Sequence, residues 1–208
     1  MTKFSSPFIF TCTAGISVGN ENEQDWFQHV VYNDSTWDGK TFSLQDTDTA
    51  LKQDPFNVET WKGDLSAFSS RGGKLLTYHG HQDWVISSQI SKLYYAHVAR
   101  TMGKPPSELD EFYRLFFVSG MDHCREGDGA WAIGQDTGAY AGTEPEENVL
   151  MALVRWVEEG VAPEVLRGAK LGEDGVTAEY WRAHCRWPKT NRYVGPGPAT
   201  EESSWVCE

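Results

Sequence analysis

An aspartate and a histidine, Asp83 and His123, each follow an apolar run that is typical of a buried strand. Asp83 ends the segment His-Gly-His-Gln-Asp that starts at His79, and His123 lies in Gly-Met-Asp-His-Cys further along the chain. Open α/β sheets place their chemistry at strand ends. A buried carboxylate fixes the tautomer of an imidazole and stabilises its protonated form, as in the last two members of a Ser–Asp–His triad. The alternative is a surface aspartate and a hydrogen-bonded core histidine.

The serine of such a triad should precede Asp83. Ser17 lies in Gly-Ile-Ser-Val-Gly at 15–19, which matches the Gly-x-Ser-x-Gly turn that exposes a nucleophile between a strand and a helix. The residues before this match are too few to supply the strands and the oxyanion loop that come ahead of such a turn. We therefore interpret 15–19 as a glycine-rich loop, and the role of Ser17 stays open.

A second chemistry competes for the same segment. His79, His81 and Asp83 match the first five positions of the H-x-H-x-D-H zinc motif of metallo-β-lactamase-like hydrolases. Two imidazoles and a carboxylate at this spacing can bind zinc and activate water. Trp84 stands where the motif has its last histidine, so we expect no metal here. A zinc-dependent hydrolase remains the alternative enzyme. If the chain is not an enzyme, the alternative is a non-catalytic interaction fragment.

Composition limits the classes of partner. The chain has 208 residues, nine of them tryptophan, which is enough for one domain with a substantial core. Its net charge of −12 argues against nucleic acid, because binding a phosphate backbone requires basic surface. No apolar run approaches the length of a membrane span. The first residues, 1–19, match a signal peptide poorly.

The elements that must position Asp83 and His123 are visible after residue 63. Apolar runs predict strands at 74–78 and 112–118, the second one central and buried on both faces. Apolar spacings of three and four predict a helix over 88–102, which Gly103 and a proline pair would end. The order strand, acid, helix, strand, histidine predicts an α/β fold, the C-terminal part of a doubly wound sheet whose amino-terminal strands are not visible.

The flanking regions are less regular. Thr143 and Glu146 form a capping-box pattern, which predicts a helix from there to Gly160. From residue 162 onward we expect mostly loops. Residues 1–63 contain aromatic clusters but little periodicity, and we expect a helix with irregular connections.

Several short segments together carry a resemblance to a known family. They are Asp64-Leu-Ser-Ala-Phe, Arg71-Gly-Gly-Lys-Leu-Leu, His79-Gly-x-x-Asp83, Phe112-Tyr-Arg-Leu-Phe, Gly120-Met-x-His-Cys124, Gly127-x-Gly-Ala130, Asn148-Val-Leu and Trp156-Val-Glu-x-Gly160. With these, the sequence from about residue 26 onward resembles the tannase and feruloyl esterase family. The combination is far more specific than any one segment.

The resemblance implies an α/β-hydrolase that cleaves phenolic esters through an acyl-serine intermediate. It assigns the triad aspartate to Asp83 and the triad histidine to His123. It also implies a disulfide between Cys185 and Cys207, and hence a secreted protein. Cys124 matches a family cysteine that is bonded to the cysteine directly before the nucleophilic serine.

The family's nucleophile segment, Gly-Cys-Ser-x-Gly-Gly, is absent from this chain. The resemblance therefore implies that residues 64–208 are the C-terminal half of the catalytic domain and that 1–63 are a connector or a remnant of the lid. The missing N-terminal half would supply the serine and the partner of Cys124. The family's calcium site lies in the missing lid, so we expect no cofactor in this chain, and we expect the isolated chain to be inactive.

Overall fold

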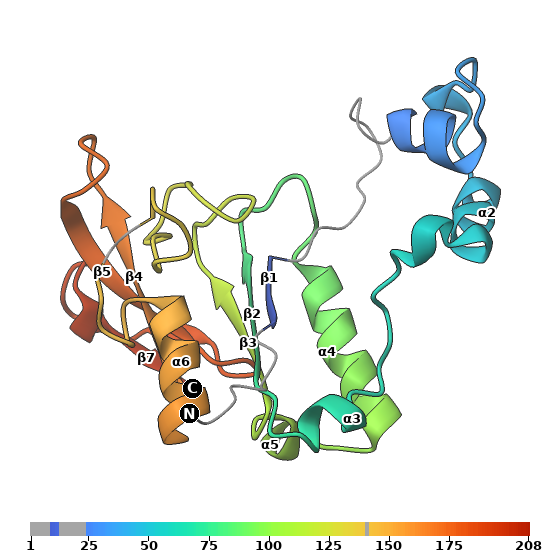
Figure 1. Cartoon of the computed structure of the whole chain (residues 1–208). Helices are drawn as coiled ribbons and strands as arrows, with labels where there is room; N and C mark the ends of the chain where they lie inside the picture. The colour runs from blue at the N-terminus through green and yellow to red at the C-terminus, as the bar shows by residue number, and fades with distance from the viewer. Residues whose placement is uncertain (1–8, 13–23, 140–141) are drawn as a thin grey trace. The chain divides into compact units, whose positions relative to one another are not determined.

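The computed structural model describes residues 9–12, 24–139 and 142–208 (Figure 1). The chain divides into two compact units, one of residues 15–62 and one that combines 1–14 with 63–208. The change of unit after residue 62 lies beside the boundary expected after residue 63. The roles assigned to the two sides, a connector or lid remnant and half of a catalytic domain, stay predictions.

The larger unit is built on a parallel sheet. Strands β1 (Ile9–Cys12), β2 (Leu75–Gly80) and β3 (Tyr113–Val118) lie in the order β1-β2-β3. All neighbours are parallel, and β2 pairs with β3 from Leu75 opposite Tyr113 to Gly80 opposite Val118. Both predicted strands are confirmed. β1 is a strand that the sequence did not reveal, and β2, not β3, is the middle strand of the three.

Helices cover both faces of this sheet (Figure 1). On one face, Phe116 and Val118 pack in a cluster with Leu153 and Trp156 of helix α6 (Val149–Glu159). On the other face, the intervening β3 residues Tyr113, Leu115 and Phe117 pack in a second cluster with helix α4. Alternate side chains of one strand thus enter two different cores, which confirms that β3 is buried on both faces.

Helix α4 (Gln89–Met102) connects β2 to β3, close to the predicted range. It ends as expected at Gly103, which has a φ of +62° and donates its N–H to the carbonyl oxygens of Ala99 and Arg100. Its buried residues are Ser91, Tyr95 and Val98. Leu93, which belongs to the apolar spacing seen in the sequence, is 55% exposed.

Helix α6 begins later than predicted. Its N-cap is Asn148, whose side chain accepts the N–H of Met151. The capping-box interpretation of Thr143 and Glu146 is therefore wrong, and the Glu146 carboxylate instead pairs with Arg155 at 2.6 Å. The helix ends at Gly160, as predicted.

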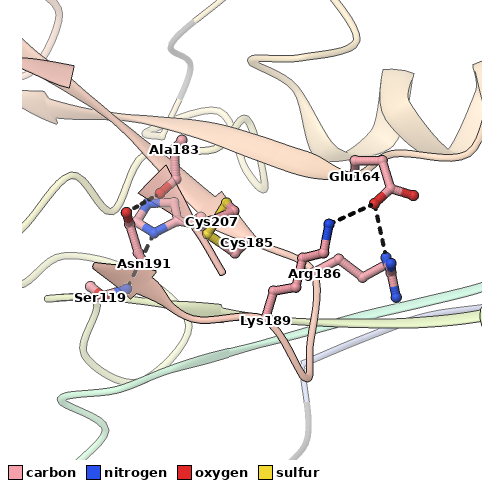
Figure 2. The surroundings of a disulfide bond; sticks show 9 residues. Ser119, Glu164, Ala183, Cys185, Arg186, Lys189, Asn191 and Cys207 are labelled. Carbon is pink, nitrogen blue, oxygen red and sulfur yellow. Dashed lines mark hydrogen bonds and ion pairs between the residues drawn. A yellow bond between two sulfur atoms is a disulfide. The ribbon is translucent and has the colours of Figure 1, made fainter. Parts of the chain in front are cut away.

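The C-terminal region contains two pairs of strands, which corrects the expectation of mostly loops. β4 (Val165–Leu171) and β5 (Ala178–Cys185) form an antiparallel pair, and β6 (Asn191–Tyr193) pairs with β7 (Trp205–Cys207). Figure 2 shows the disulfide between Cys185 and Cys207, which joins β5 to β7 and confirms the predicted pair.

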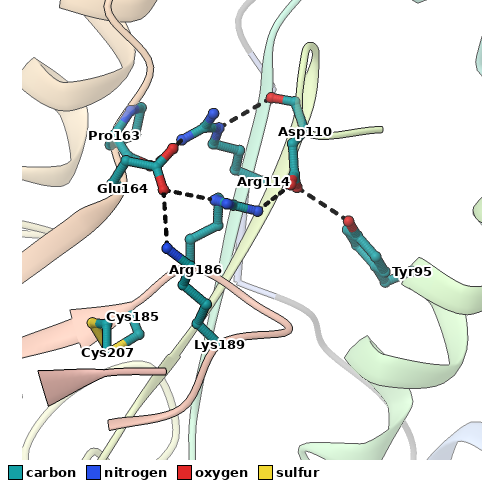
Figure 3. Close-up of polar contacts among 9 residues, drawn as sticks. All are labelled: Tyr95, Asp110, Arg114, Pro163, Glu164, Cys185, Arg186, Lys189 and Cys207. Carbon is teal, nitrogen blue, oxygen red and sulfur yellow. Dashed lines mark hydrogen bonds and ion pairs between the residues drawn. A yellow bond between two sulfur atoms is a disulfide. The ribbon is translucent and has the colours of Figure 1, made fainter. Parts of the chain in front are cut away.

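A network of charged side chains ties the start of β3 to the later strands (Figure 3). Asp110, directly after helix α5 (Pro106–Leu109), accepts hydrogen bonds from Tyr95 of α4 and from Arg186. Arg114 of β3 and Arg186 both pair with Glu164, which precedes β4. Burial raises the pKa of the Asp110 carboxyl, although Arg186, Tyr95 and Arg114 act in the opposite direction.

The smaller unit contains helix α2 (Leu44–Gln53) and short helical turns at Trp26–Val31, Gly39–Thr41 and Pro55–Asn57. Its aromatic clusters pack together, with the ring of Phe27 centred 5.1 Å from Trp37 and 5.3 Å from Phe42.

Two further short helices belong to the larger unit, α3 (Ser66–Ser69) and the turn Glu202–Ser204. Among the described residues, no helix has the length and apolar character that a membrane crossing requires.

Candidate active site

Asp83 lies in the turn that follows β2, and its carboxylate has no exposed surface. One oxygen, Oδ1, accepts the backbone N–H groups of Val85 at 2.9 Å and Ile86 at 2.7 Å. An aspartate that accepts amides two and three residues further on closes a tight turn around itself. Residues close in sequence therefore hold Oδ1 in place without any contact from a distant part of the chain.

His123 lies in the loop after β3, and its Nδ1 is 2.9 Å from Asp83 Oδ2. The expected contact between these two side chains is present, and their roles in catalysis stay a prediction. The ring is 38% exposed, and its Nε2 has no hydrogen-bond partner in the described part of the chain. One ring nitrogen thus faces a buried carboxylate while the other is available to a further group.

The Asp83 carboxylate is held in its charged form. Burial alone would raise its pKa, but the Ile86 N–H, the His123 side chain and the Val85 N–H together hold the pKa below its ordinary value. A charged carboxylate at this position can orient His123 and stabilise its protonated ring.

Glycines allow the two loops to approach each other. A Cβ on Gly80 would lie 2.2 Å from the carbonyl oxygen of Asp122, so the end of β2 and the His123 loop touch backbone to backbone. Within that loop, a Cβ on Gly120 would lie 2.4 Å from the backbone of Gly129, and one on Gly127 would lie 2.2 Å from the Gly120 carbonyl. Gly120 and Gly127 also have positive φ angles. Side chains at these positions would push the loops apart.

Polar contacts fix the loops further. Gln82 and Asp128 exchange two hydrogen bonds between the Asp83 turn and the His123 loop, at 3.2 and 3.4 Å. Lys170 of β4 donates to the carbonyl of Gly127 at 2.9 Å. The loop that carries His123 is thus held from both sides.

A second histidine contacts the same carboxylate oxygen. His79, the fifth residue of β2, is 1% exposed, and its Nε2 lies 3.2 Å from Asp83 Oδ2 and 3.2 Å from the carbonyl oxygen of Ile86. Its Nδ1 lies 2.8 Å from Ser91 Oγ on α4. In the sequence, His79 belonged to the zinc pattern and to the segment His79-Gly-x-x-Asp83, and neither indicated this contact.

The zinc pattern does not assemble. His81 is exposed and its ring packs against Phe117, with ring centres 4.8 Å apart. No group of three or more histidine, cysteine or acidic side chains that could bind a metal occurs among the residues that the structure describes. The nitrogens of His79 face Asp83, Ile86 and Ser91.

His184 of β5 contacts the loop that carries His123, and the sequence did not point to it. It is 1% exposed, with Nε2 2.8 Å from the Ala130 carbonyl and Nδ1 3.4 Å from the Ser119 N–H. Ser119 and Ala130 are the two ends of the loop that carries His123. Burial lowers the pKa of His184 to about 4. No local pattern could have found this residue, because both of its partners are more than fifty residues away.

Cys124 is in a disulfide bond, and the described residues contain no free cysteine. The expectation that its partner lies outside this chain is therefore wrong. The partner's side chain is outside the described residues, as are Ser17 and the segment 15–19. Cys124 has a φ of +68°, so the residue directly after His123 turns the chain sharply.

Known proteins match this chain over most of its length. A family model described as tannase and feruloyl esterase matches residues 5–208. A probable feruloyl esterase B-2 from Aspergillus terreus is 58% identical over 184 residues, which are 88% of this chain and 35% of that protein. A probable feruloyl esterase B-1 from Aspergillus oryzae is 56% identical and is covered to 34%.

Solved structures of related esterases also match this chain. The crystal structure of feruloyl esterase B from Aspergillus oryzae, an α/β-hydrolase, matches with a TM-score of 0.85 and 56% identity, over 89% of this chain and 37% of that one. Tannin acyl hydrolase from Aspergillus niger, at 21% identity and a TM-score of 0.66, shares the fold. The chain spans about a third of the length of the curated relatives that it matches, less than the expected half. The resemblance seen in the short segments is confirmed: this chain belongs to the tannase and feruloyl esterase family.

Proposed function

We propose that this chain supplies the aspartate and histidine of a serine esterase that hydrolyses phenolic esters of the feruloyl type. The observation that carries the proposal is the 2.9 Å contact between His123 Nδ1 and the buried Asp83 Oδ2, with the other side of the ring accessible. The names of relatives that are more than half identical support the feruloyl class of substrate.

In the proposed reaction, His123 Nε2 takes the proton of a serine hydroxyl while the serine oxygen attacks the ester carbonyl carbon. The tetrahedral intermediate then collapses, and His123 returns the proton to the departing alcohol. Water repeats the sequence on the acyl-enzyme and releases the acid. Asp83 keeps the proton of the neutral ring on Nδ1, so that Nε2 is the basic nitrogen, and stabilises the ring when it is protonated.

The nucleophilic serine and the oxyanion hole belong, in this proposal, to a part of the protein beyond this chain. The coverage of about a third of each relative supports this division. Residues 64–208 would then be a C-terminal part of the catalytic domain, 1–63 a connector or lid remnant, and the isolated chain would be inactive. The Cys185–Cys207 disulfide supports a secreted protein, because such bonds persist in oxidising compartments.

The test is a hybrid enzyme. Residues 24–208 of this chain would replace the matching segment of feruloyl esterase B from Aspergillus oryzae, and hydrolysis of methyl ferulate would be measured. We expect an active hybrid whose kcat falls by about four orders of magnitude in His123→Ala, with a comparable loss in Asp83→Ala.

The matched control is His29→Ala, an exposed histidine of the smaller unit, which should leave kcat unchanged. Full activity of the hybrid with His123→Ala would contradict the proposal. Ester hydrolysis by the isolated chain that is lost in Ser17→Ala would instead make Ser17 the nucleophile.

A further inference from the structure

We propose that His79 is a positioning residue for the Asp83–His123 pair, because it fixes the carboxylate oxygen that His123 uses. This inference rests on the proposed function. Two histidines from different elements, His79 of β2 and His123 of the loop after β3, contact the same atom, Asp83 Oδ2.

The hydrogen positions on His79 follow from its neighbours. Its Nε2 faces a carboxylate and a carbonyl, which accept hydrogen bonds and cannot donate them. Nε2 therefore carries the proton and donates it toward both. Nδ1 is then the acceptor in the neutral ring, and the Ser91 hydroxyl at 2.8 Å donates to it. The contacts of both nitrogens therefore fit one tautomer of the buried His79 ring, with the proton on Nε2.

Two anchored points fix the plane of a carboxylate. The amides of Val85 and Ile86 hold Oδ1, and they make no hydrogen bond to Oδ2. His79 holds Oδ2 independently of His123. The partly exposed His123 ring therefore meets an oxygen that is already in place, which lowers the entropic cost of aligning the pair.

The simpler alternative is that His79 is a core histidine that needs hydrogen bonds because it is buried. In that case the Ile86 carbonyl and Ser91 would be sufficient partners, and the contact with Asp83 would have no effect on His123. The two interpretations differ in what happens at His123 when only the Asp83 contact is lost.

Two amide variants separate these interpretations. In His79→Gln, the side-chain amide reaches the place of the ring Nε2 and can donate to Asp83 Oδ2. In His79→Asn, the shorter amide reaches the place of Nδ1, toward Ser91, but not Asp83. Both are polar and uncharged, so they differ chiefly in reach.

The measurement is the exchange with water of the His123 Nδ1 proton, observed by NMR on the ¹⁵N-labelled chain of 208 residues. The resonance is assigned by its absence in His123→Gln. We expect exchange about tenfold faster in His79→Asn, as for the loss of one hydrogen bond to a charged group, and a rate within twofold of the original in His79→Gln.

Tyr95→Phe is the matched control. Tyr95 is a buried donor to another buried aspartate, Asp110, so this variant removes a similar bond away from Asp83. It should leave the exchange rate unchanged. Equal rates in the Asn variant and the original chain would overturn the proposal, as would an equal acceleration by Tyr95→Phe. If the Asn variant does not fold, a folded Gln variant with an unprotected His123 proton is also contrary evidence.

The exchange experiment needs no catalysis, so it fails or succeeds separately from the proposed function. An inactive hybrid enzyme together with accelerated exchange in His79→Asn would remove the esterase proposal and keep the positioning role. In an active hybrid, His79→Asn should lower kcat about tenfold with little change in KM, and His79→Gln should restore most of it.

Discussion

The carbonyl oxygen of Asp122 lies so close to Gly80 that a Cβ there would be 2.2 Å away. This contact sets the separation between the end of β2 and the loop that carries His123. It makes the geometry of the Asp83–His123 pair depend on a position that has no side chain.

Gly80→Ala should therefore destabilise the protein and loosen the pair. We expect a loss of about 1–3 kcal/mol in the free energy of unfolding, because the methyl group meets the backbone carbonyls of Met121 and Asp122. Urea unfolding measures the loss. Gly172→Ala is the control, because its nearest neighbour would be 3.5 Å from the added Cβ. Similar midpoints for the two variants would contradict the prediction.

Asp110→Ala should be strongly destabilising, because it leaves the Arg186 guanidinium and the Tyr95 hydroxyl without their shared acceptor. We expect a loss of about 3 kcal/mol, as for one partner removed from a buried ion pair. Glu164→Ala should cost less than about 1 kcal/mol, because the Glu164 side chain is 55% exposed. Thermal and urea unfolding of both variants test this order, and a larger effect for Glu164→Ala would reverse it.

His184 should make stability depend on pH. Its pKa is about 4 in the folded protein because of burial, against about 6.5 in an unfolded chain. Between these values the unfolded chain binds the extra proton, so the free energy of unfolding falls as the pH is lowered. The loss should reach roughly 3 kcal/mol at the lower end of the window.

The matched variant is His184→Gln, which does not titrate and keeps a donor for the Ala130 carbonyl. Its unfolding free energy, measured in urea at several pH values, should change less between about pH 6.5 and pH 4 than that of the original chain. The same slope in both proteins would show that His184 is not the group responsible.

Loss of the Cys185–Cys207 bond should cost roughly 3 kcal/mol in the chain-entropy model for a sequence separation of 22 residues. The test is the double variant Cys185→Ser/Cys207→Ser rather than a reductant, because Cys124 is also in a disulfide. Hydrogen exchange should rise first in the β6–β7 pair, which the bond ties to β5. An unchanged urea midpoint would contradict the model.

The parts of the fold that the sequence predicted best have strong local signals. β2 and β3 lie in largely apolar stretches and are buried along their whole length, and α4 ends where Gly103 can adopt a positive φ. The β4–β5 pair was missed because charged residues such as Arg167 and Lys170 interrupt its apolar pattern. These side chains bond to Glu147, Glu202 and Gly127, which no local pattern can indicate.

The residues of the candidate site also divide into those with a local signal in the sequence and those without one. Asp83 and His123 were identified because each lies in the loop that follows an apolar strand, which is a local property. His184 contacts residues that are distant in sequence. The contact between His79 and Asp83 was missed because a spacing of histidines cannot show which way the rings point. The capping pattern at Thr143 failed because Asn148, five residues later, also fits an N-cap and is the one used.

The turn around Asp83 also determines how an asparagine would sit there. The Val85 and Ile86 amides need an acceptor at the Oδ1 position, so the amide oxygen of Asp83→Asn would face them and its NH₂ would face His123. His123 would then have to accept at Nδ1 and carry its proton on Nε2, where it cannot receive one from a serine. Replacing one oxygen of Asp83 by an NH₂ group would thus switch His123 to the other tautomer.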